Sequence, residues 1–205
     1  MINEFSRKIY SKEKNTGKGM YIAAVFFSLP VLGIAAEILV NQSDFNGLFI
    51  ALPFAVFALL LFVIGKYQQK KYERLGKAPL TITPSVCTIG EKTSGSITIQ
   101  KENFNKVQKL ILTCLRMSSA KNNTNSTTTY TPVWTCDIEP VIHFSGGETK
   151  LEFTFMIPTG SKPTSGNWFK ANKFHWELSF EYVETLDNIK RTWEIPVVEG
   201  YKLAS

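Results

Sequence analysis

Two apolar runs near the start of the chain constrain its structure more than any other feature. Residues 20–40 and 48–64 are almost entirely apolar, and the polar residues 41–47 separate them. An α-helix needs about 20 apolar residues to cross roughly 30 Å of hydrocarbon. The polar stretch contains Asn, Ser, Asp and Gly, which favour turns. The pattern predicts a transmembrane hairpin over residues 19–65, with the lipid bilayer around it.

The charges beside the hairpin predict its orientation. Residues 1–18 carry five basic and two acidic groups, residues 66–77 carry five basic groups and one acidic, and residues 41–47 carry no Lys or Arg. Basic flanks are retained in the cytoplasm. We therefore expect a multi-pass protein of the inner (plasma) membrane with both termini cytoplasmic. Residues 78–205 have a net charge of only +1, which argues against nucleic-acid binding because such binders carry a basic face on the folded domain.

Two polar features of the membrane region leave alternatives open. The only ionisable residue inside either apolar run is Glu37, which is either a proton or ion site or a carboxylate close enough to the helix end to reach water. The basic residues that follow the second run either bind anionic lipid specifically or serve topology and non-specific attraction to headgroups. These residues are Lys66, Lys70, Lys71, Arg74 and Lys77.

From residue 80 onward the pattern changes from helical to strand-like. Residues 150–157 alternate apolar and polar, and residues 173–182 and 191–198 do so most clearly. Side chains of residues i and i+2 share one face of a strand, so each of these segments is predicted to have one apolar face and one solvent-exposed polar face. About seven short strands without helical periodicity predict an all-β antiparallel sandwich. The expected division is a basic tail at 1–18, the hairpin at 19–65, a juxtamembrane linker at 66–77, the sandwich at 78–199 and a tail at 200–205.

The segments LILTCLR, LEFTFMIP, KPTS and FHWELSFEY, followed by RTWEIPVV, resemble a family of uncharacterised bacterial membrane proteins. That family combines a two-helix membrane hairpin with a C-terminal arrestin-like or immunoglobulin-like sandwich. The resemblance covers residues 78–199 and the layout of the hairpin, and its motifs are structural. It implies an adaptor role that works by binding other proteins, and it carries over no catalytic residue.

The residue types for catalysis or metal binding are sparse. Three cysteines, Cys87, Cys114 and Cys136, are an odd and widely spaced set that does not predict a disulfide framework or a zinc site. Of the two histidines, His175 falls on the wet face of its strand and is predicted to be solvated, and His143 has no assigned place. Phosphate-loop, nucleophile-elbow and zinc-protease motifs are missing. We therefore expect no enzyme activity, no metal and no cofactor.

The remaining functions are of two kinds. The first is a protein-interaction module or accessory subunit of a membrane complex, with contacts at the predicted loops 118–129 and 158–167. Trp168 and Phe169 in the second loop are aromatic in a polar setting, and they either form a contact or membrane-dipping patch or plug one end of the sandwich. The second kind is a binder of lipid or a small apolar ligand, and an uncharacterised enzyme is a third, weaker alternative. The sequence favours the interaction module.

Overall fold

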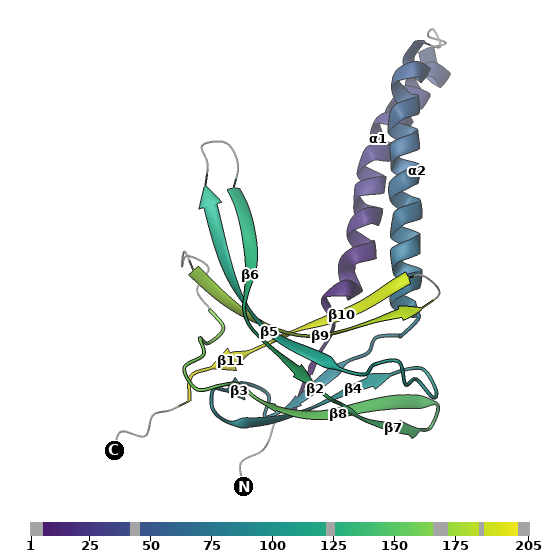
Figure 1. Cartoon of the computed structure of the whole chain (residues 1–205). Coiled ribbons are helices and arrows are strands. Elements are labelled where there is room, and N and C mark those ends of the chain that lie inside the picture. The colour runs from purple at the N-terminus through teal and green to yellow at the C-terminus, as the bar shows by residue number, and fades with distance from the viewer. Residues whose placement is uncertain (1–5, 42–45, 122–125, 166–171, 185–186, 201–205) are drawn as a thin grey trace. The chain divides into compact units, whose positions relative to one another are not determined.

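The computed structural model describes residues 6–41, 46–121, 126–165, 172–184 and 187–200 (Figure 1). The chain divides into two compact units. One comprises Glu13–Arg74, and the other comprises Met1–Lys12 together with Leu75–Ser205. The first unit is helical and the second is built of β-strands.

The helical unit is a hairpin of α1 (Thr16–Asn41) and α2 (Asn46–Glu73), preceded by the 3₁₀ turn η1 (Lys12–Asn15). Along each helix the least exposed residues recur at alternating spacings of three and four, which places them in one stripe toward the other helix. Several of these residues are small, and Gly17 lies so close to Gly65 that an added Cβ would be 3.2 Å from the Gly65 carbonyl oxygen. Near the middle of the two helices, the rings of Phe27 and Phe57 meet edge to face at 4.8 Å between centroids.

The outer surface of the hairpin is apolar. Both helices are long and apolar enough to cross a membrane. The second helix runs nine residues beyond the predicted end at Ile64, so most of the predicted linker 66–77 is helical. Lys, Gln, Glu and Tyr all tolerate helix, and Gln69 Nε2 donates to Glu73 Oε1 at 2.8 Å, one turn later. The expected linker is therefore confined to the few residues after Glu73, where Gly76 has a φ of +64°.

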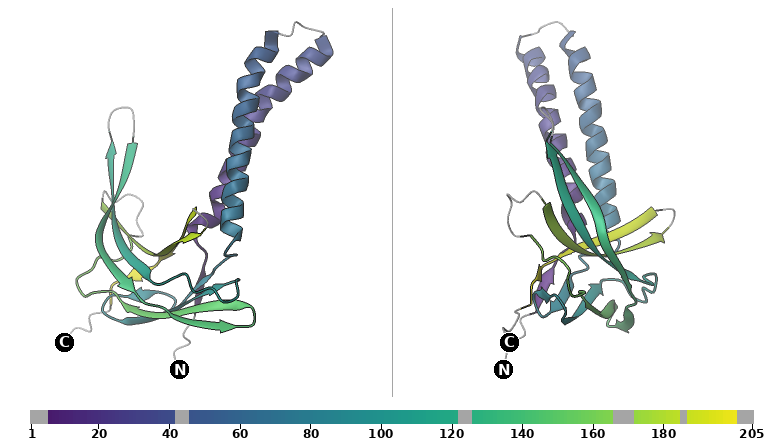
Figure 2. Two further views of the ribbon diagram at one scale, coloured as in Figure 1. Left: turned by 45° about the vertical axis from the view of Figure 1, so that its right-hand side comes forward. Right: turned by 60° about the vertical axis from the view of Figure 1, so that its left-hand side comes forward.

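The β-unit consists of two antiparallel sheets that face each other across one core (Figure 2). The first sheet has the order β1-β2-β4-β8-β7, the second sheet has the order β10-β9-β5-β6, and β11 pairs with β3 in parallel. The prediction of an antiparallel all-β region is confirmed. Its strands are β1 (Arg7–Ile9), β2 (Leu80–Thr83), β3 (Cys87–Thr88), β4 (Lys92–Ile99), β5 (Leu110–Lys121), β6 (Ser126–Ile138), β7 (Val141–Ser145), β8 (Glu148–Met156), β9 (Asn172–Glu184), β10 (Asp187–Ile195) and β11 (Val197–Val198).

The core is made by the inward-facing alternate residues of both sheets. Trp176 and Trp193 are fully buried, and each indole N–H has a partner: Trp176 donates to the Lys162 carbonyl at 2.8 Å and Trp193 to the Ala78 carbonyl at 3.2 Å. In the first sheet Gly95 lies opposite Phe153, whose ring covers the glycine. The missing side chain of Gly95 therefore provides the space that the aromatic ring fills.

The N-terminal segment differs from the predicted tail. Residues 7–9 form β1 and pair antiparallel with β2, and Ser11 is buried. A three-residue strand that contains two basic residues is too short to show a period of two, and its partner lies beyond the whole hairpin in sequence. The consequence is that the chain leaves the β-unit at Lys12 and returns to it at Leu75.

The predicted loop 118–129 is also mostly strand. β5 continues to Lys121 and β6 begins at Ser126, with Ser118 opposite Thr129 and Ala120 opposite Thr127. The polar composition predicted a loop, but threonine is β-branched and fits a strand. The register shifts between Cys114 and Leu115, so the opposing strand carries one extra residue there.

Candidate functional site

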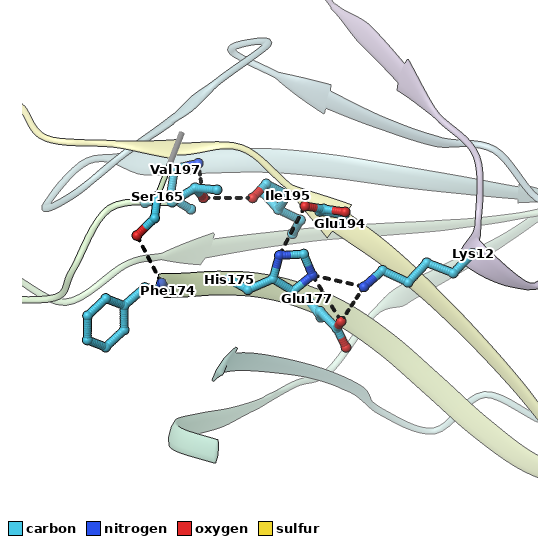
Figure 3. A network of polar contacts seen from close by, with 9 residues as sticks. Lys12, Ser165, Phe174, His175, Glu177, Glu194, Ile195 and Val197 are labelled. Carbon is cyan, nitrogen blue, oxygen red and sulfur yellow. Dashed lines mark hydrogen bonds and ion pairs between the residues drawn. The ribbon is translucent and has the colours of Figure 1, made fainter. Parts of the chain in front are cut away.

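A cluster of charged side chains joins the N-terminal segment to the second sheet (Figure 3). His175 and Glu177 project from the outer face of β9, because they alternate with the buried residues Trp176 and Leu178. The Lys12 ammonium lies 2.5 Å from Glu177 Oε1 and 2.8 Å from His175 Nε2. The other ring nitrogen, Nδ1, lies 3.0 Å from Glu194 Oε1 on β10. We call Lys12, His175, Glu177 and Glu194 the N-terminal clasp.

The contacts of the clasp change the pKa of Glu177 and limit the exposure of the His175 and Glu177 side chains. Hydrogen bonding with His175 and, next, the ammonium of Lys12 lower the pKa of Glu177 to about 2. His175 and Glu177 are each only 19% exposed at the side chain. The prediction that His175 is a solvated residue is therefore wrong, because the segment that covers it comes from 163 residues away in sequence. No group of three or more metal-binding side chains occurs in the part of the chain that the structure describes.

A groove of about 350 Å³ lies beside the clasp. The loop that forms one wall is tied to β11 and β9: Val197 N–H donates to Thr164 Oγ1 at 3.0 Å, and Phe174 N–H donates to Ser165 Oγ at 3.0 Å. The groove is lined by Arg7, Ile9, Tyr10, Lys12, Thr164, Glu194, Ile195 and Pro196.

The open edge of the first sheet at β7 is a second candidate surface. Among the described residues β7 pairs only with β8, so one side of its backbone faces outward. Val141 is 60% exposed and Phe144 is 50% exposed. Natural sheets protect such edges with charge, proline, bulges or short length. β7 has the sequence VIHFS and carries no proline, lysine or acidic residue.

The other three edges of the two larger sheets do carry these protections. β1 is three residues long and contains two basic residues. β6 contains Pro132, and its pairing with β5 is interrupted by a register shift. β10 carries four charged residues along its length. Of the four edge strands of the two larger sheets in the described part of the chain, β7 is the one whose sequence is compatible with pairing to another chain.

The sequence-predicted residues are distributed over both units. Glu37 is exposed on α1, and Lys66 and Lys70 are exposed one turn apart on α2. Lys71 also lies on α2, Arg74 follows its end, and Lys77 belongs to the β-unit. Trp168 and Phe169 lie outside the described residues.

The thiols and the other histidine occupy separate places. Burial raises the pKa of Cys87 and of Cys114 to about 11, whereas Cys136 is exposed. His143 is on β7, with Nε2 3.3 Å from Glu152 Oε2 in an exposed pair. Cys114 lines a second groove together with aromatic side chains, and the described residues around that groove include no histidine.

Comparison with known proteins gives little further information. No protein-family model matches the sequence, and no curated protein matches it significantly. Among solved structures, Spo0M, a sporulation control protein from Bacillus subtilis, superimposes with a TM-score of 0.41 at 14% identity. The match covers 60% of this chain and spans 48% of Spo0M. The geometry of the chain itself therefore has to support any functional conclusion.

Proposed function

We propose that this chain is a membrane-anchored interaction module, in which the helical hairpin spans the bilayer and the β-unit docks an extended segment of a partner protein in the cytoplasm. The observation that carries the anchor is the apolar outer surface of the hairpin. Large apolar side chains are exposed on both helices, including Phe26, Leu32, Phe49 and Leu59. Soluble proteins rarely expose a contiguous apolar surface of this extent to water, whereas the hydrocarbon core of a bilayer accommodates one.

The connection between the units supports an even number of membrane crossings. β1 and β2 flank the hairpin in sequence and are hydrogen-bonded to each other. Both ends of the hairpin therefore belong on the same side of a membrane. A helix of 26 residues is about 39 Å long, which exceeds the roughly 30 Å of a hydrocarbon core. The basic residues on both flanks favour the cytoplasm for that side.

The docking role is supported by β7. An extended peptide that adds to an open edge gains main-chain hydrogen bonds along its length, and the exposed side chains of the edge supply specificity. Val141 and Phe144 provide apolar contacts at two positions of this strand. The partner is accordingly an extended, apolar-rich segment of another protein in a membrane complex.

Labelling with a membrane-impermeant maleimide tests the topology. The native Cys136 is an exposed thiol of the β-unit, and Ser43→Cys places a second thiol between the two helices. In intact cells the S43C thiol should react and Cys136 should remain unmodified until the cells are lysed. Labelling of Cys136 in intact cells would show that the orientation is opposite to the one proposed. Labelling of neither thiol before lysis would contradict the proposed membrane hairpin.

Site-specific photo-crosslinking tests the docking edge. A photoreactive residue in place of Phe144 should give a discrete crosslinked partner in native membranes. The matched control is the same residue in place of Val183, which is 69% exposed on β9 of the second sheet. Val141→Lys should abolish the crosslink from position 144, because lysine on an edge strand opposes pairing. An unchanged product in V141K, or the same product from position 183, would contradict docking at β7.

A further inference from the structure

The second groove of the β-unit has the form of a small-molecule site. Its volume is about 450 Å³, within the range of pockets that bind small ligands. Trp176 is fully buried and Cys114 nearly so, and the Trp134 ring lies 5.5 Å from that of Trp176. Phe174 and the half-exposed Val133 complete the apolar side chains. We call this the aromatic groove.

The groove is held open by local structure. The register shift between Cys114 and Leu115 displaces β6 where Val133 and Trp134 lie. The opposite wall is the loop 158–162, which is fixed by a turn in which Ser161 N–H donates to the Pro158 carbonyl at 3.2 Å. The Trp176 indole N–H holds the Lys162 carbonyl at 2.8 Å. Because hydrogen bonds fix the loop, a ligand would enter a preformed space and would not have to order one.

The lining selects a particular chemistry. The apolar side chains that are at least partly exposed in the groove are Val133, Trp134, Pro158 and Phe174, whereas Trp176 is fully buried and its one polar group is bonded within the protein. Burial keeps the Cys114 thiol neutral, so it acts as a small apolar group. Lys162 is exposed and is the one charged residue among the described residues that line the groove. The apolar part of a ligand would therefore fit against the apolar lining of the groove, and an anionic group on the same ligand would pair with the lysine.

We propose that the aromatic groove binds a small amphiphile of the fatty-acid type, with its apolar chain against Trp134, Pro158 and Phe174 and its carboxylate near the Lys162 ammonium. This site is independent of docking at β7, because the groove is formed by β5, β6, β9 and the 158–162 loop. The two proposals can therefore fail separately.

A fluorescence titration of the full chain in phosphatidylcholine nanodiscs tests the proposal. The probe is decanoate brominated on its chain, which quenches tryptophan at short range, and the uncharged comparison is the correspondingly brominated decanol. Saturable quenching by the acid is expected, with binding of the alcohol weaker by about three- to fivefold, the scale of one partly exposed ion pair. Lys162→Gln should make the two affinities equal, while Lys150→Gln, an exposed lysine of β8, should leave the acid unaffected.

A second variant separates binding in the groove from partition into lipid. Val133→Trp adds bulk at an exposed position in the mouth of the groove and should abolish saturable quenching without changing the linear component from lipid. Equal saturable binding in wild type and V133W would overturn the proposal, as would equal affinity of the acid and the alcohol for the wild type. Binding of a peptide with a C-terminal phenylalanine, together with no saturable binding of decanoate, would also overturn it in favour of a peptide site.

Discussion

Replacement of Gly95 by alanine tests how the core of the first sheet is packed. An ideal Cβ at this position would lie 2.6 Å from two ring carbons of Phe153. Favourable contacts between carbon atoms occur at about 3.5–4.0 Å, so the ring would have to move by about 1 Å. Phe153 is 5% exposed and its ring stacks with Phe155 at 6.2 Å between centroids. The ring therefore has little room to move.

The expected cost of Gly95→Ala follows from this crowding. Insertion of a methyl group into a well-packed core typically costs about 1–3 kcal/mol. For a β-unit of about 140 residues, an unfolding entropy of about 2 cal/mol/K per residue converts this cost into a melting temperature lowered by roughly 3–10 °C. The assay is thermal unfolding of the full chain in detergent, followed by tryptophan emission, because the buried Trp176 and Trp193 both report on the core.

Two further variants make the test specific to the contact between Gly95 and Phe153. Ser96→Ala changes the neighbouring residue, which projects from the opposite face, and should alter the free energy of unfolding by no more than about 0.5 kcal/mol. Phe153→Leu should cost less in the G95A background than in the wild type, because the smaller side chain relieves the clash. A G95A protein as stable as the wild type, or strict additivity in the double variant, would refute the packing described for this sheet.

Two other predictions concern titratable groups. The pKa of Glu177 is lowered to about 2 in the folded chain, so its contribution to stability is complete above the unfolded pKa of about 4.3 and is lost as the pH falls through 2. Glu177→Gln should therefore make the free energy of unfolding, measured by urea titration, fall less steeply between pH 5 and pH 2. Lys12→Met should have a smaller effect of the same kind. An unchanged dependence of the unfolding free energy on pH would contradict the contacts of the clasp. A thiol reagent at pH 8 should modify Cys136 rapidly and leave Cys87 and Cys114 unmodified until denaturation, since burial raises the pKa of both to about 11; rapid modification of all three would contradict their burial.

The parts of the fold that could be predicted from sequence are those with a long apolar pattern, either alternating or continuous. β9 and β10 alternate apolar and polar residues over many positions, so one face of each was identifiable without a structure. The two helices were identifiable from their continuous apolar runs, although α2 was predicted too short because its last two turns are polar. β1 was missed because three residues carry no periodicity. The facing ends of β5 and β6 were missed because their sequence is almost entirely polar and has no apolar alternation.

The candidate sites were harder to predict because they depend on contacts between distant residues. Lys12 was interpreted as one of several basic residues that set the orientation, and His175 as a solvated residue, yet they lie 2.8 Å apart. The aromatic groove depends on a register shift near Cys114 and on the fixed course of the 158–162 loop. Neither feature has a sequence signal. The apolar, unprotected composition of β7 was visible in the sequence, but its position at a sheet edge was not.

The order of strands in the first sheet connects the anchor with the docking proposal. Because β1 precedes the helices and pairs with β2, which follows them, the hairpin is an insertion into the β-unit and not an addition to its N-terminus. The two connections between the units therefore follow β1 and precede β2, the first two strands in the order of the first sheet. In the order β1-β2-β4-β8-β7, the open edge is at the other end of the same sheet. A partner strand that pairs with β7 would extend that sheet without displacing β1, so docking of a partner does not require the contact between β1 and β2 to open.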